Sequence, residues 1–268
     1  MSGGGPLRFG YRTLDFVSWK IEDAITRIAE LGYEGIELCL EHPDLAPRNL
    51  TPSRVRYLLS LLQDYGLELT ALSYQGLNDQ LEIRRRNTQI AIEIASAFRA
   101  PVLIIASRRA EPPRLRAQWD ELVMWYQQLC QQAEASGLRI AVEAIPDMVV
   151  HRTEDLCRMV HDVQHPLFAV NFDIGHAALT DDDLSWAIYS LSQWLVHVHL
   201  DDVRSQQEHH LIPGEGQVNW TELKEAFESI GYRGPFVFDV RQGGNSPEER
   251  AARCLEAIRK LWSETVPA

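Results

Sequence analysis

The sequence predicts a single (β/α)₈ barrel, an α/β fold class known as the TIM barrel, and three observations favour it. Eight short apolar runs alternate with amphipathic segments, which is the pattern of parallel strands joined by helices. Eight such units fit one closed barrel of about 250 residues, and the chain has 268. Four successive runs end on a carboxylate or an imidazole, at Glu143, Asp173, His199 and Asp239. We therefore expect one domain over residues 1–268.

The predicted strands are the apolar runs themselves. In chain order they cover residues 7–12, 35–39, 67–73, 102–106, 139–143, 168–173, 194–199 and 235–239. A doubly wound open sheet is the competing architecture. Such a sheet would carry a glycine-rich phosphate-binding turn after its first strand, and Gly10-Tyr-Arg-Thr13 is not one. No linker or shift in composition divides the chain, so the barrel is favoured.

The segments between the strands carry helix signals. Gly32 permits a left-handed stop, and Asn219 with Glu222 forms a capping box. Ser246-Pro-Glu-Glu249 supplies a cap, a proline at the first helical position and a reciprocal glutamate. The expected helices cover residues 19–31, 53–65, 84–98, 114–136, 153–163, 184–191 and 220–230, and a last one follows Ser246.

Composition excludes several classes of function. The formal charge of −12, with basic residues scattered and densest at Arg84-Arg85-Arg86, disfavours nucleic-acid binding. No apolar run of 18 residues exists, so we expect no membrane span. Residues 1–6 lack the features of a signal peptide and are expected to be disordered. The cysteines form no Cys-x-x-Cys pair, which favours reduced thiols and a cytoplasmic location: Cys39, Cys130, Cys157 and Cys254.

The four strand-end residues predict a metal site. Parallel strands point their carboxyl ends to one face, so Glu143, Asp173, His199 and Asp239 should converge. Three carboxylates close together repel each other when ionised, and one divalent cation removes that repulsion. One nitrogen and three oxygens favour Mn²⁺, Mg²⁺ or Co²⁺, with Zn²⁺ as an alternative. The competing interpretation is that each residue is only a solvated strand terminus.

Several motifs resemble those of the xylose isomerase-like TIM barrel superfamily. They are Gly32-Tyr-Glu-Gly-Ile-Glu-Leu38, Phe172-Asp-Ile-Gly-His176, His197-Val-His-Leu-Asp-Asp202, Pro213-Gly-Glu-Gly-Gln-Val-Asn-Trp220 and Gly231-Tyr-Arg-Gly-Pro-Phe236. The superfamily includes sugar phosphate isomerases/epimerases, ketose 3-epimerases, hydroxypyruvate isomerase, inosose dehydratase and endonuclease IV. The similarity spans nearly the whole chain and does not single out a substrate.

The resemblance implies roles for the strand-end residues. Glu143, Asp173, His199 and the eighth-strand acid would hold the metal, and Glu143 with Asp239 would also transfer the protons. The eighth-strand acid is usually glutamate, whereas this chain has Asp239, whose side chain reaches about 1.5 Å less. Either the metal lies nearer strand eight, or a water intervenes, or the acid–base role of this position is lost.

Four further residues are candidates for substrate binding. His176 lies in the Asp-x-x-His pattern of the superfamily, and His210 lies where relatives place a polar substrate contact. Glu37 ends the second strand and either faces the barrel mouth or forms a salt bridge with Arg12 or another core arginine. Arg241 follows the last strand and could bind a phosphate or carboxylate. Solvated or structural side chains are the alternatives at each position.

The first hypothesis is a divalent-metal-dependent isomerase or epimerase of a small sugar, sugar phosphate or polyol, acting through an ene-diolate. The alternatives are an inosose dehydratase-like lyase, an endonuclease IV-like phosphodiesterase and a non-catalytic metabolite-binding barrel. The expected partner is the small-molecule substrate. Trp119, Trp125 and Tyr126 of one helix pack either against neighbouring elements or against a second copy of the chain in a homo-oligomer.

Overall fold

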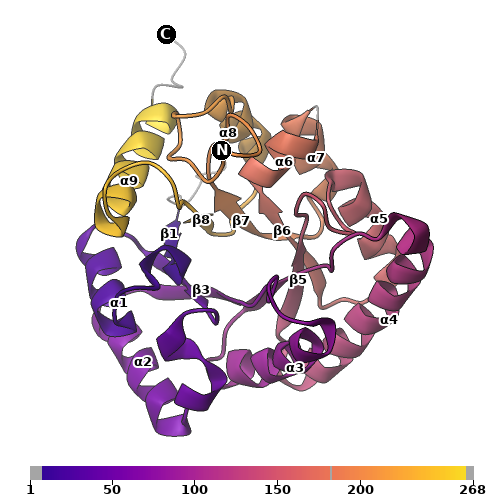
Figure 1. The fold of residues 1–268 in the computed structure, drawn as a ribbon. Helices are drawn as coiled ribbons and strands as arrows, with labels where there is room; N and C mark the ends of the chain where they lie inside the picture. Colours follow the sequence, from indigo (N-terminus) through magenta and orange to yellow (C-terminus); the bar gives the residue numbers. More distant parts are fainter. Residues whose placement is uncertain (1–7, 182, 264–268) are drawn as a thin grey trace.

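The computed structural model describes residues 8–181 and 183–263 and confirms the (β/α)₈ barrel. The strands pair in parallel and in chain order, and β8 pairs with β1 to close the sheet. Figure 1 shows the ring of strands enclosed by helices. The strands are β1 Phe9–Arg12, β2 Gly35–Cys39, β3 Glu68–Ser73, β4 Val102–Ala106, β5 Arg139–Glu143, β6 Phe168–Asp173, β7 Leu195–Leu200 and β8 Phe236–Phe238. The expected disorder of residues 1–6 lies outside the described residues.

The helices also follow the predicted order, with small shifts at their ends. They are α1 Ile21–Glu30, α2 Pro52–Asp64, α3 Leu81–Ala97, α4 Leu115–Ala133, α5 Thr153–Val163, α6 Ile174–Thr180, α7 Leu184–Leu191, α8 Trp220–Ser229 and α9 Pro247–Ser263. The capping box is present, because the Asn219 side chain accepts a hydrogen bond from the Glu222 amide at 3.3 Å. Helix α6 was not predicted. It begins at Ile174, and the preceding residue Asp173 is its N-cap, whose carboxylate accepts the amide of His176 at 2.8 Å.

The two faces of each strand have different packing roles. Outward side chains such as Ile140, Val142 and Phe172 belong to the main hydrophobic cluster, which the surrounding helices complete. Inward side chains form layers, because successive residues of a strand alternate between faces. One inward layer is small and apolar, with Ala141 and Ala169 among its members. The inward positions nearer the carboxyl ends are polar and buried, and they form the candidate site: Arg12, Glu37, Glu143, Asn171, Asp173, His197, His199 and Asp239.

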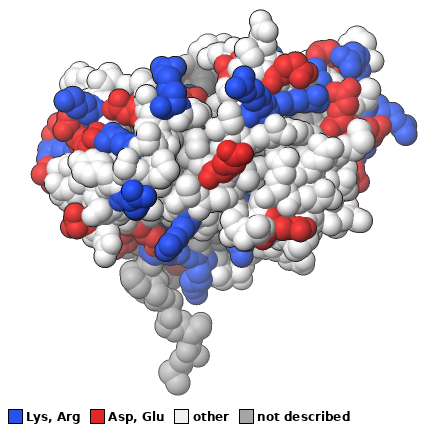
Figure 2. All heavy atoms as spheres, turned by 90° about the horizontal axis from the view of Figure 1, so that it is seen from below, with Lys and Arg blue, Asp and Glu red and all other residues white. Residues whose placement is uncertain are grey.

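The aromatic residues of α4 pack mainly within the chain. Trp119 and Tyr126 are buried, and the indole of Trp119 donates to Asp162 at 2.7 Å. Figure 2 shows acidic and basic side chains interspersed over one side of the molecule. Among the helices of the described residues, none has the length and hydropathy of a membrane span.

Candidate metal centre and active site

Three of the four predicted metal ligands lie together at the carboxyl ends of β5, β6 and β7. Glu143, Asp173 and His199 each offer one atom, and these atoms lie within 4.8 Å of one another. His199 Nδ1 lies 3.4 Å from Glu143 Oε2 and 3.4 Å from Asp173 Oδ2. The register explains this arrangement, because Asp173 and His199 are paired neighbours across β6 and β7. All three residues are buried, so their charges are shielded from water.

The fourth predicted ligand, Asp239, occupies a different environment. Among the described residues it belongs to none of the groups that could hold a cation. Its Oδ2 lies 2.6 Å from Arg12 Nη1 and 3.3 Å from Arg241 Nη2. Burial alone would raise the pKa of Asp239, but Arg12 and Arg241 hold that pKa well below its usual value. The aspartate is therefore an ionised partner of two arginines.

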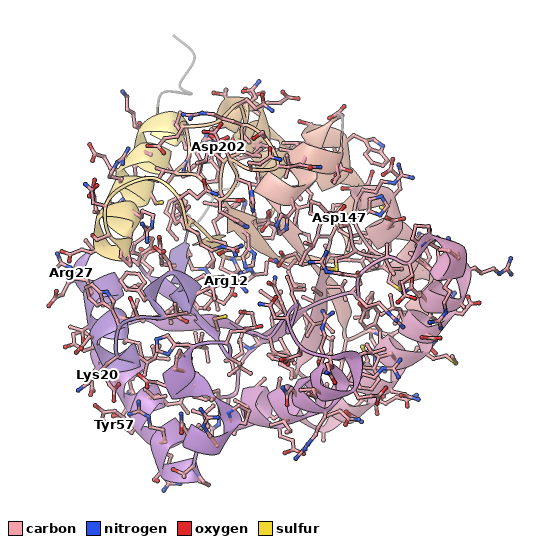
Figure 3. The ribbon with its side chains drawn as sticks, in the orientation of Figure 1. Arg12, Lys20, Arg27, Tyr57, Asp147 and Asp202 are labelled. Atoms are coloured by element: carbon pink, nitrogen blue, oxygen red, sulfur yellow. The ribbon has the colours of Figure 1, made fainter. Side chains whose placement is uncertain are left out.

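Glu37 lies inside the barrel and is fully buried. Its Oε1 lies 2.8 Å from Arg12 Nε, and its Oε2 accepts a hydrogen bond from His199 Nε2 at 2.7 Å. Burial would raise the pKa of Glu37, but His199 and Arg12 lower it. Of the two placements expected for Glu37, the structure has the salt bridge with Arg12. Figure 3 shows Arg12 within the ring of strands, whereas Lys20 and Tyr57 lie at the outer edge.

His176 lies next to the ligand group on the first turn of α6. Its Nδ1 lies 3.1 Å from Glu143 Oε1 and 3.6 Å from Asp173 Oδ1. Burial would lower the pKa of His176, but Asp173 and Glu143 raise it. The pKa of Glu143 is lowered well below its usual value in spite of burial, because His176 and His199 contact its carboxylate. These pKa shifts favour a protonated His176 beside an ionised Glu143.

The other two predicted substrate contacts, His210 and Arg241, border Asp239. His210 is buried with a positive φ of 54°, and its Nδ1 lies 2.9 Å from the Asp239 carbonyl oxygen and 2.8 Å from Asp201 Oδ2. Arg241 contacts His210 Nε2, and its side chain is 40% exposed. Burial lowers the pKa of His210 to about 3, so the ring is neutral. Of these two residues, Arg241 is the more accessible to a solute.

Several residues of the site were not predicted from the sequence. Asn171 is buried in β6, and its amide donates to Glu143 Oε2 at 3.0 Å and contacts His199 Nδ1 at 3.1 Å. Gln75 donates to the same Glu143 oxygen at 3.1 Å. A signal for Asn171 was present, because it is a polar residue two positions before Asp173 in an apolar strand and so faces inward with it. Gln75 follows β3 in a loop and carried no comparable signal.

The donor set fits a divalent cation. Glu143 Oε1 and Asp173 Oδ2 are buried and accept no hydrogen bond of good geometry from the described residues, and their ion-pair neighbours are His176 Nδ1 at 3.1 Å and His199 Nδ1 at 3.4 Å. Arg12 and Arg241 form salt bridges with Glu37 and Asp239, whereas no arginine of the described residues forms one with the negative charges of Glu143 and Asp173, which are also buried. A cation held by Glu143, Asp173 and His199 would offset the excess negative charge. Imidazole with carboxylates suits Mn²⁺, Co²⁺ or Zn²⁺, and the oxygen donors also suit Mg²⁺.

The fold and the site define a (β/α)₈ barrel with a carboxylate–imidazole centre at the carboxyl ends of its strands. The chain belongs to the xylose isomerase-like TIM barrel family, whose model matches residues 25–261. This membership confirms the superfamily that the sequence motifs indicate.

Two curated relatives and one solved structure place the chain within this family. It is 26% identical over 261 residues to fructoselysine 3-epimerase of Shigella flexneri, covering 91% of this chain and 94% of that protein. It is 22% identical over 266 residues to inosose dehydratase of Geobacillus thermodenitrificans, covering 89% of each. The structure of 3-keto-D-glucoside 4-epimerase YcjR from E. coli has a TM-score of 0.80 at 18% identity, covering 95% of this chain and 100% of that one. At that identity the structural match supports the fold alone.

Proposed function

We propose that this chain is a divalent-metal-dependent isomerase or epimerase of a small sugar or polyol. The observation that carries the proposal is the buried group of Glu143, Asp173 and His199, in which one ligand atom of each residue lies within 4.8 Å of the others. The relatives include a fructoselysine 3-epimerase, which supports the same class of reaction. Glu143, Asp173 and His199 would hold the cation, whereas Asp239, which is paired with Arg12 and Arg241, lies outside this group.

The reaction would depend on proton transfer by this chain's own residues. A divalent cation in this position supplies electrostatic stabilisation of the negative oxygens of an ene-diolate. Glu143 would remove the proton next to the substrate carbonyl, since a carboxylate in the site can act as general base. Asp239 would lie on the side of the substrate opposite to Glu143, and Arg12 and Arg241 keep its carboxylate ionised. His176, at 3.1 Å from Glu143, would donate a hydrogen bond to a substrate hydroxyl.

A lyase of the inosose dehydratase kind is the second candidate, and one observation favours it. Asp239 is held by two arginines, which leaves Glu143 as the base of the site. Elimination can use a single residue: Glu143 takes the proton, the electrons of the C–H bond form the C=C bond, and the C–O bond breaks as the protonated Glu143 returns its proton to the departing hydroxide, which leaves as water. The inosose dehydratase relative is consistent with this alternative.

The test combines metal content with a panel of substrates. The purified chain is expected to bind one divalent ion, and incubation with ketoses, ketose phosphates and inososes in D₂O should exchange the α-proton of at least one of them. A chelator should stop the exchange. Formation of an epimer supports the isomerase, whereas net loss of water supports the lyase. Turnover that persists in the chelator would contradict both proposals.

A further inference from the structure

We propose that Glu37 is a positioning residue, which fixes the ring of His199 so that Nδ1 faces the cation site. The inference rests on the metal centre of the proposed function and deepens it. Its basis is a row of three buried side chains from β1, β2 and β7, in which Arg12 holds one oxygen of Glu37 and His199 holds the other. Among the described residues, Glu37 is grouped with His197 and His199 and not with Glu143 and Asp173.

The contact between Glu37 and His199 determines which nitrogen of the imidazole carries the proton. A carboxylate can only accept, so Nε2 must carry the proton at the 2.7 Å contact with Glu37 Oε2. In a neutral ring, the lone pair then lies on Nδ1. That nitrogen points to the opposite side, where Glu143 Oε2 and Asp173 Oδ2 each lie 3.4 Å away. The Glu37 carboxylate thus selects the tautomer that binds a cation at this side.

A salt bridge with Arg12 holds the side chain of Glu37 in place. The two residues are register partners across β1 and β2, and Arg12 Nε lies 2.8 Å from Glu37 Oε1. Neither side chain is exposed by more than 1%. The guanidinium of Arg12 also contacts Asp239, directly after β8. Arg12 is therefore held from both sides of β1, and it in turn fixes the carboxylate of Glu37.

A second cation between Glu37, His197 and His199 is the competing explanation, because these three residues also lie within 4.8 Å of one another. The geometry argues against it. Glu37 and His199 are already in direct contact at 2.7 Å, whereas two ligands of one ion lie about 2 Å from the ion and farther from each other. His197 uses its Nδ1 on Asn171 at 2.9 Å. Arg12 adds a positive charge beside Glu37, which opposes a second cation.

The substitution Glu37→Gln tests the proposal because an amide has one acceptor and one donor end. Arg12 can only donate, so the amide oxygen is expected to face Arg12 and the NH₂ group to face His199. Nε2 would then become the acceptor, and the proton would move to Nδ1, on the side of the cation. The variant keeps the volume of the side chain and reverses the tautomer.

The first measurement is Mn²⁺ affinity, followed through the signal of free Mn²⁺ in EPR titrations of the full chain. Glu37→Gln should weaken binding about 10–100-fold, the usual effect of losing an outer-shell partner of a metal-bound histidine. Asp15→Asn is the matched control, since the Asp15 carboxylate is also paired with an arginine, Arg250 at 2.6 Å, with its side chain 6% exposed, and it forms no salt bridge with His199. The control should bind Mn²⁺ as the wild type does. Equal affinity in all three proteins would overturn the inference.

The second measurement does not depend on the folding of a variant. Histidine ¹⁵N spectra of the wild-type chain with Zn²⁺ should show His199 bound through Nδ1 and protonated at Nε2, and coordination through Nε2 would overturn the inference. Neither readout uses a sugar. A chain that shows these results without sugar turnover contradicts the proposed reaction only. A wild type that binds neither ion contradicts the reaction and the role of Glu37 together.

Discussion

Arg12 Nη1 lies 2.6 Å from Asp239 Oδ2, and this contact joins the first strand of the barrel to the last. Both side chains are at most 2% exposed. The same guanidinium contacts Glu37 on β2, so one arginine pairs with two buried acids where the barrel closes. The aspartate at the end of β8, where relatives usually have the longer glutamate, is therefore paired with the guanidinium of Arg12 on the neighbouring strand β1.

Replacing Arg12 by methionine should destabilise the fold strongly. The substitution keeps much of the side-chain volume but leaves Glu37 and Asp239 without their buried partner, and breaking a buried ion pair from one side costs about 3–5 kcal/mol. Urea unfolding followed by circular dichroism measures the free energy of unfolding. Arg27→Met is the control, because Arg27 pairs with Glu30 and Glu248 at the surface and exposed ion pairs contribute little to stability. Similar losses in the two variants would contradict the role of the buried pair.

Glu143→Gln and Asp239→Asn should separate the two candidate proton-transfer groups. Loss of a general base lowers the rate about 10²–10⁴-fold, so Glu143→Gln should lose α-proton exchange to that extent. Asp239→Asn should retain exchange, because the salt bridges with Arg12 and Arg241 lower the pKa of this carboxyl group and make it a weak base. Exchange is measured by ¹H NMR in D₂O with an active substrate of the panel. Exchange at the wild-type rate in Glu143→Gln would rule out Glu143 as the base.

The fold and half of the site follow from local sequence patterns. Apolar runs separated by amphipathic segments predict the strands, and parallel strands bring their carboxyl ends to one face. This rule predicts that Glu143, Asp173 and His199 lie close together, and one atom of each lies within 4.8 Å of the others. The same rule placed Asp239 with them, but its carboxylate turns to Arg12.

The environment of Asp239 could not be read from its neighbours in the sequence. Its partner Arg12 lies 227 positions away, and the two residues meet only because β8 closes on β1. Helix α6 was missed for a related reason. It has 7 residues, too few to show an amphipathic period, and it depends on the caps that Asp173 and Asp201 provide.

Asp173 has two roles that two substitutions can separate. Its carboxylate accepts the His176 amide at the start of α6 and also belongs to the ligand group. Asp173→Asn keeps an acceptor for the cap and removes the charge, whereas Asp173→Ala removes both. Both variants should lose metal binding, and the alanine variant should be less stable than the asparagine variant by about 1 kcal/mol, the usual value of an N-cap.

Metal content and urea unfolding, each measured without added metal and then with Mn²⁺, provide the comparison. Added Mn²⁺ should raise the free energy of unfolding of the wild type only, because a ligand stabilises the state that binds it. Mn²⁺-dependent stabilisation of Asp173→Asn would show that this carboxylate is not a ligand.

Gly175→Ala should destabilise the first turn of α6, because the added methyl group would clash with Asp201. A Cβ atom at Gly175 would lie 2.3 Å from Asp201 Oδ2, while the Gly175 amide donates to Asp201 Oδ1 at 2.8 Å. Overpacking of this kind costs about 1–3 kcal/mol. In the background Asp201→Ala the clash is absent, so the same change should be neutral or stabilising, since alanine favours helix over glycine by about 1 kcal/mol. Equal effects in both backgrounds would exclude a steric origin.

His42 should make stability depend on pH, because both of its ring nitrogens are engaged in the neutral form. Nε2 contacts the Phe16 carbonyl oxygen at 3.2 Å, and Nδ1 accepts the Asp44 amide at 3.2 Å. Burial lowers the pKa of His42, so the unfolded chain binds the proton more readily than the fold does. The free energy of unfolding should therefore fall as the pH drops below about 6.5, by at most about 1.4 kcal/mol per pH unit from this group.

His42→Asn isolates this contribution, since its amide oxygen can still accept the Asp44 amide but the side chain does not titrate. The variant loses the contact with Phe16 at every pH and is expected to be less stable than the wild type at pH 7. Its free energy of unfolding should change less between pH 7 and pH 5, because the proton that drives the wild-type loss has no site in the variant. Urea unfolding at both pH values gives the two slopes. A slope as steep as that of the wild type would assign the pH dependence to other groups.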